Sequence, residues 1–222
     1  MTISEKLHEW LNTGVHRIGE IEILSGASGA AYVLCHYEDV ELARMEDFGG
    51  LTVYSGPDAA RDLSLLNDEG DYRFAKACQD LRRGWVMTLA DMDELKRALD
   101  LFYPAALGLN VALEIGCLEI ENLRDKLNRQ TGMYRYARNI SDAGAQRLVR
   151  EVCGPAHQCA KRILWRIDDE TPLEDSEASR FQGIVGGISG NEALPMLCRE
   201  ACNHFVAECR RVSKEEAAAK SS

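Results

Sequence analysis

Three features that would settle the class of this protein at once are missing: a long apolar run, a basic leader and an excess of positive charge. No apolar stretch in the 222 residues approaches the roughly 20 that a membrane-spanning helix requires. The start, MTISEKLHEWLNTGVHRIG, lacks the basic start and apolar core of a signal peptide and has the pattern of a short amphipathic helix. We therefore expect a cytoplasmic protein without membrane segments.

The charge balance is acidic. Lysine and arginine number 26 against 36 aspartate and glutamate residues, for a formal net charge of −10. A nucleic-acid surface needs lysine and arginine clustered on one face, so we expect no nucleic-acid partner. The hydrophobic content of 45% is ordinary for a globular protein, and the length suits one large domain or two small ones.

What the chain does have is cysteine, eight residues in all. Stable disulfides are rare in the reducing cytoplasm. Clustered cysteines in such proteins more often bind a metal or take part in catalysis. The cysteines therefore determine which functions need to be considered.

Alternating strand and helix patterns predict an α+β protein of two small domains. We expect an N-terminal helix, an α+β scaffold domain, a second domain built around the cysteines and a flexible polar tail, at residues 1–16, 17–128, 129–212 and 213–222. In the scaffold, apolar runs predict strands at 19–24, 30–37, 51–55 and 84–89. Helices are expected after Pro57, after a cap at Asp91 and over 105–127.

In the second domain, the pattern predicts a strand at 133–138, a helix at 141–152 and a strand at 162–167. A glycine-rich loop at 182–191 and a closing helix at 197–212 complete it.

Four of the cysteines form two pairs. Cys153 and Cys159 flank a loop in which Gly154 and Pro155 turn the chain sharply. Cys198 and Cys202 are four residues apart on the predicted closing helix, so they would project from one helix face. Cys209 would lie about 10 Å beyond Cys202 along that helix, too far for one compact site, and we expect it in the core.

Two metal sites and one structural reading suit these pairs. A [4Fe–4S] cluster needs four thiolates, and a loop that wraps it can point backbone N–H groups at its sulfides. Zinc is the alternative, with His157 or His204 able to replace one ligand, although zinc ligand pairs are commonly spaced more tightly than in CGPAHQC. Inert packing of the cysteines is the third reading.

The segments GMYRYARNISDAGAQRLVREVC, CAKRILW and LPMLCREACNHFV resemble a small [4Fe–4S]-binding domain that accompanies CbiX-type sirohydrochlorin chelatases in some bacteria. The upstream stretch from DEGDYRFAKACQDLRRGWVMTL to LKRALDLFYPAALG resembles the stabilising domain that precedes it in those proteins. The resemblance implies one [4Fe–4S] cluster, with Cys153, Cys159, Cys198 and Cys202 as its ligands.

The sequence departs from those proteins in one respect. The histidine of a Gly-His-Gly-Ser-like turn, the signature of the chelatase module, does not occur here. The five histidines show no paired metal-insertion arrangement: His8, His16, His36, His157 and His204. We therefore expect an accessory protein rather than a catalyst that inserts a metal by itself.

Further residues near the cysteines have a functional and a structural interpretation. Arg129, Arg135 and Arg138 could contact tetrapyrrole carboxylates or an acidic redox partner, or simply form a solvated strand face. Trp165 could shield the cluster from water, or pack in the core.

The resemblance thus predicts an electron-transfer or accessory protein of tetrapyrrole or cobalamin metabolism, with a tetrapyrrole-processing enzyme or a redox protein as partner. A cluster held by four cysteines leaves no open iron, which argues against Lewis-acid catalysis. The alternatives are a zinc-stabilised protein-interaction module and a redox-sensing regulator.

Overall fold

A computed structural model of the chain describes residues 2–26, 29–73, 79–118, 120–153, 159, 161–164, 166 and 192–220. The chain forms two compact units, and each is considered by itself. The first unit comprises Met1–Leu118 and Ile184–Met196, and the second comprises Glu119–Gly183 and Leu197–Ser222. The fold is α+β, as predicted.

The first unit is built on a six-stranded sheet of order β4-β5-β3-β2-β1-β7. Its strands are β1 (Arg17–Ile18), β2 (Ile21–Ser25), β3 (Tyr32–His36), β4 (Thr52–Ser55), β5 (Trp85–Leu89) and β7 (Ala193–Leu194). The β4–β5 and β1–β7 pairs are parallel, and the other pairs are antiparallel. The four strands predicted for the scaffold are thus confirmed as β2, β3, β4 and β5.

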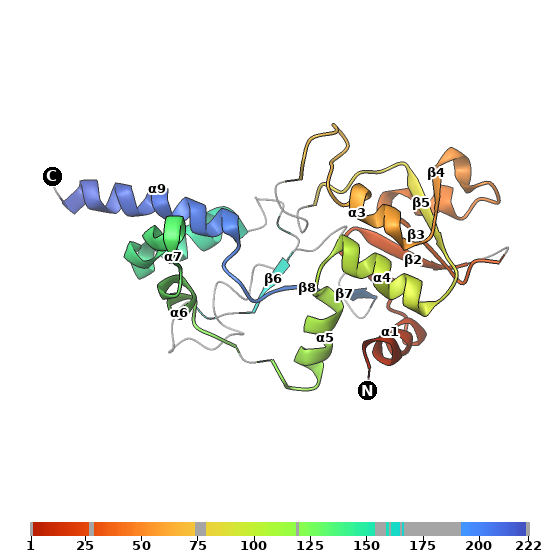
Figure 1. Cartoon of the computed structure of the whole chain (residues 1–222), viewed down its shortest axis with the longest axis horizontal. Helices are drawn as coiled ribbons and strands as arrows, with labels where there is room; N and C mark the ends of the chain where they lie inside the picture. Colours follow the sequence, from red (N-terminus) through yellow and green to blue (C-terminus); the bar gives the residue numbers. More distant parts are fainter. Residues whose placement is uncertain are drawn as a thin grey trace. The chain divides into compact units, whose positions relative to one another are not determined.

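Helices cover one face of this sheet (Figure 1). They are α1 (Ile3–Asn12), α3 (Ala60–Leu63), α4 (Met92–Phe102) and α5 (Ala106–Glu114). The core against them holds Leu7 and Trp10 of α1, as the amphipathic pattern predicts. The predicted cap of α4 is confirmed, since the Asp91 carboxylate accepts the Glu94 N–H at 2.9 Å.

The opposite face of the sheet is covered by a smaller apolar cluster. Val33, Cys35 and Val86 point to this face because strand side chains alternate. They pack against the short helix α2 (Val40–Ala43) and the segment that follows it. Cys35 is therefore a core residue of the first unit.

In the described part of the second unit, α-helices pack around a separate core. They are α6 (Leu123–Asn128), α7 (Asp142–Leu148) and α9 (Asn203–Lys220). Ser141 caps α7 by accepting the Gly144 N–H at 3.0 Å, where the sequence predicted a helix to begin. A two-stranded sheet of β6 (Lys161–Ile163) and β8 (Met196–Cys198) completes the described part.

Several predicted elements are wrong in type or extent. The segment predicted as a strand at 133–138 is a 3₁₀ helix, Gly132–Asn139, which packs against α9. The helix predicted over 105–127 is two helices, because Gly116, at φ 69°, ends the helical path after α5. The tail predicted to be flexible from residue 213 continues α9 to Lys220, where alanine-rich sequence favours helix and Arg147 pairs with Glu215 at 2.7 Å.

The division between the units also differs from the predicted boundary at residue 129. The second unit begins at Glu119, and residues 184–196 belong to the first unit. The reason is β7, which pairs in parallel with β1 through Arg17 and Ala193 and so extends the first sheet. Among the described helices, none has both the length and the apolar character of a membrane span.

Candidate metal centre

Four cysteines are placed at the ends of secondary structure elements in the second unit. Cys153 ends a π-helical turn, Val149–Cys153, that continues α7. Cys159 lies two residues before β6, and Cys198 is the last residue of β8. Cys202 immediately precedes α9. Each of the four cysteines therefore lies at the end of a helix or strand or within two residues of one.

Strand pairing links the two cysteine pairs. The Leu164 N–H, directly after β6, donates to the carbonyl oxygen of Cys198 at 2.8 Å. This β6–β8 contact brings the segment that follows Cys159 beside the segment that carries Cys198. Two stretches about 40 residues apart in sequence, 159–164 and 196–202, thus meet in the fold.

The prediction that Cys198 and Cys202 share one helix face is wrong. Met196 and Leu197 are buried, and with Cys198 they form a strand; helix α9 starts only at Asn203. The chain therefore turns between the two sulfurs. Cys209 does lie on α9 and is fully buried in the second core, so its predicted core position is confirmed.

The four thiols interact electrostatically. Burial raises the pKa of the Cys153 thiol, and the charges of Cys159, Cys198 and Cys202 as thiolates raise it further. Burial likewise raises the pKa of Cys198 to about 11; the Lys161 ammonium opposes this rise, and Cys202 and Cys159 add to it.

In the described part of the chain, no three His, Cys, Asp or Glu side chains gather closely enough to hold a single metal ion.

The donor set fits an iron–sulfur cluster. Thiolates are the ligands that such clusters use, and hydrogen bonds to sulfur tune them. The Phe205 N–H donates to Cys202 Sγ at 3.4 Å from the first turn of α9. A backbone hydrogen bond from Lys161 to Cys159 opposes the burial that raises the pKa of that thiol. Backbone donors thus already face two of the four sulfurs.

The arginines predicted to contact an anion are not equivalent. The Arg129 guanidinium is paired with the Glu121 carboxylate at 2.6 Å, and Arg138 Nε donates to the carbonyl oxygen of Gln130 at 2.7 Å. Arg135 lies beside the ring of Tyr136, with its guanidinium carbon 5.8 Å from the ring centroid. On the same ring, Arg210 of α9 lies at 5.4 Å, a residue that sequence inspection missed because it is distant along the chain.

Trp165 lies outside the described residues, as do Cys78, His157 and the predicted loop at 182–191.

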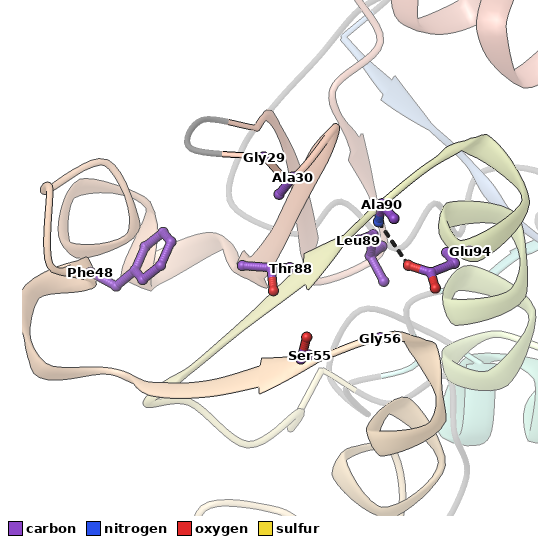
Figure 2. A pocket seen from close by; sticks show the side chains of 9 residues that line it. All are labelled: Gly29, Ala30, Phe48, Ser55, Gly56, Thr88, Leu89, Ala90 and Glu94. Carbon is purple, nitrogen blue, oxygen red and sulfur yellow. Dashed lines mark hydrogen bonds between the residues drawn. The ribbon is translucent and has the colours of Figure 1, made fainter.

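Two surface cavities in the first unit are lined by described residues. One, of about 510 Å³, lies at the ends of β4 and β5 beside the start of α4, and Figure 2 shows Phe48 at one side and Glu94 at the other. Of its lining residues only Glu94 is ionisable, and that carboxylate accepts the Ala90 N–H at 2.7 Å as part of the helix cap. A second cavity, of about 650 Å³, lies beside α2 and is lined by His16, Glu22 and Arg44 among others. Neither brings together soft ligands, so the cysteines remain the candidate metal centre.

The fold of the second unit and its cysteines fit the class of iron–sulfur proteins. Residues 115–211, which include all four cysteines, match the family model described as a 4Fe-4S iron-sulfur cluster binding domain. Residues 3–111 match the family model of the DR2241 stabilising domain. The two matches follow one another along the chain, and the second gives a [4Fe–4S] cluster as the cofactor.

One solved structure shares the fold over nearly the whole chain. DR2241 from Deinococcus radiodurans is described as a multi-domain protein with structural similarity to chelatases and two additional novel domains. It superposes with a TM-score of 0.73 at 23% identity, over 96% of this chain and 41% of that protein. This chain thus spans less than half of the length of that relative. No curated protein matches the sequence significantly.

Proposed function

We propose that Cys153, Cys159, Cys198 and Cys202 hold one [4Fe–4S] cluster, and that the protein serves as an electron-transfer or accessory protein in tetrapyrrole metabolism. The observation that carries the ligand assignment is that all four cysteines lie within the residues that match the cluster-binding family, where the pairing of β6 with β8 brings the segments of the two cysteine pairs beside each other. When bound, such a cluster supplies one-electron chemistry.

The chain's own residues hold and shield the site. Cys153 and Ala201 pack against the second apolar core, which limits water on that side. The Phe205 N–H donates to Cys202 Sγ, and the Lys161 N–H donates to Cys159, where it favours the thiolate. The Lys161 ammonium favours the charged form of Cys198 as well.

The tetrapyrrole connection is supported by the chelatase similarity stated for DR2241. A tetrapyrrole-processing enzyme is therefore the partner we propose, with the cluster placed near that enzyme's substrate. Arg135 and Arg210 are both exposed and both lie near the Tyr136 ring. Among the described residues, neither forms an ion pair. They offer positive charge to tetrapyrrole carboxylates or to acidic residues of the partner.

Metal analysis of anaerobically prepared protein tests the ligand assignment. We expect about four iron and four sulfide per chain, falling to near zero when any of the four cysteines is changed to serine. Stoichiometric zinc without acid-labile sulfide would refute the assignment.

Redox measurements separate electron transfer from a purely structural cluster. A working carrier should show a reversible couple in an anaerobic titration, and deletion of its gene should disturb tetrapyrrole pools. An irreducible cluster together with unchanged pools would refute the electron-transfer role while leaving the cluster assignment intact.

A further inference from the structure

A buried lysine, Lys126, pairs with a carboxylate of the segment that joins Cys198 and Cys202. Lys126, in α6, has only 2% of its side chain exposed, between the buried residues Leu123 and Leu127. An ammonium group is stable at such a position only when carboxylates compensate for its lost hydration. The carboxylates that pair with Lys126 therefore identify the segments that its ammonium group ties together.

Those partners come from two separate segments. Lys126 Nζ donates to Glu121 Oε2 at 2.6 Å and lies 3.7 Å from Glu200 Oε1. Glu121 is itself fixed, because Arg129 pairs with it at 2.6 Å and its carbonyl oxygen accepts the Arg166 N–H at 3.0 Å. Glu200 is different, since 77% of its side chain is exposed and it lies midway between Cys198 and Cys202.

The segment 198–202 is also anchored near both of its ends. Its first residue is held by the hydrogen bond from Leu164 to the Cys198 carbonyl. Its last residue is held by the start of α9, where the Val206 N–H donates to the Cys202 carbonyl at 3.0 Å. At its centre, the Glu200 carbonyl oxygen faces Cys198 Sγ at 3.0 Å, so the backbone of Glu200 touches a proposed ligand directly.

We propose that Lys126 is a positioning residue for the cluster: its ammonium group holds Glu200 and thereby fixes the turn that presents Cys198 and Cys202. This inference rests on the proposed ligand assignment. Lys126 itself touches no sulfur in the described contacts and acts through Glu200. A ligand segment held at its centre as well as its ends opens less often, so the cluster is retained longer.

The test compares rates of cluster loss from anaerobically reconstituted protein in excess chelator, followed by the visible absorption of the cluster. We expect Lys126→Met to raise this rate by about tenfold, in the direction expected for breaking a mostly buried ion pair. Lys126→Arg should restore a rate close to that of the wild type, because it keeps the charge. Lys96→Met is the matched control, since Lys96 pairs with Asp100 at 3.5 Å on the surface of the first unit.

Glu200→Gln tests whether Lys126 acts on the cluster through Glu200. It remains informative if Lys126→Met fails to fold, because Glu200 lies at the surface. It should raise the rate in the same direction, and the double variant should lose its cluster no faster than Lys126→Met alone. We also expect the electron paramagnetic resonance spectrum of the reduced cluster to change in Lys126→Met.

Three results would overturn the inference. The first is a wild-type rate of cluster loss in Lys126→Met, and the second is a wild-type rate in Glu200→Gln. The third is faster cluster loss in Lys126→Met with an unchanged spectrum and a loss of apoprotein stability large enough to account for the faster rate. Each of these leaves the proposed function standing. Absence of a cluster from the wild-type protein would instead refute the proposed function.

Discussion

Two cysteines seven residues apart should have opposite roles, and replacing each by serine separates iron binding from folding. Cys202 is exposed at the start of α9, with its sulfur facing the Phe205 N–H. Cys209 is fully buried among the apolar residues of the second core. The first substitution should therefore remove iron, and the second should mainly affect stability.

The magnitudes follow from burial. Cys209→Ser places a hydroxyl in an apolar core, which costs about 1–3 kcal/mol when the hydroxyl is poorly satisfied. A loss of about 2 kcal/mol changes the folded-to-unfolded ratio roughly 30-fold. Cys202→Ser alters a surface position, so the apoprotein should change by less than about 0.5 kcal/mol while the holoprotein loses the cluster.

Both quantities can be measured on the same preparations. Urea unfolding of the apoprotein, followed by circular dichroism, reports the free energy of unfolding. Iron and sulfide analysis after anaerobic reconstitution reports the cluster. Iron loss in Cys209→Ser with unchanged apoprotein stability, or full iron content in Cys202→Ser, would refute the assignment of the two roles.

Three further outcomes are expected. Cys35→Ser and Cys117→Ser should both leave the iron content unchanged, and iron loss in either variant would contradict the ligand set. Only Cys35→Ser should lower the stability of the first unit, because Cys35 is buried and Cys117 is exposed. Gly144→Ala should destabilise the apoprotein by about 1–3 kcal/mol in urea unfolding, because the added Cβ would collide with the Glu216 carboxylate and with Ile140; a stabilised variant would show that these side chains move freely. Lys126 and Arg129 lower the pKa of Glu121 to about 2, so its contribution to stability should be complete above about pH 4.3 and disappear as the pH falls toward 2; Glu121→Gln should flatten that part of the stability–pH curve.

Features that depend on neighbours in sequence were predicted well. The strands β2, β3, β4 and β5 follow from alternation, the cap at Asp91 follows from a side chain that accepts a nearby N–H, and the helix predicted from Ser141 begins there. The choice of a cysteine-rich second domain with a [4Fe–4S] cofactor also came from the sequence, through its resemblance to a known domain.

The local pattern failed where two structures were compatible with the same residues. LPMLCREACNHFV has enough apolar residues at helical spacing to suggest one helix. A strand formed instead at Met196–Cys198, because β6, some 30 residues earlier, supplies its hydrogen-bond partner. Likewise, the segment 133–138 has strand-like composition, yet it lies in the 3₁₀ helix Gly132–Asn139, which packs against α9.

By itself, then, the sequence determined which residues could build the centre: four cysteines in two pairs, inside an α+β chain. Only the tertiary structure decided how those residues are held. It set Cys198 at the end of a strand, brought Arg210 to Tyr136, and placed the Lys126 ammonium between Glu121 and Glu200. The physical reason is that strand pairing and the pairing of buried charges join groups far apart along the chain, and such partners leave no periodic signal in the sequence.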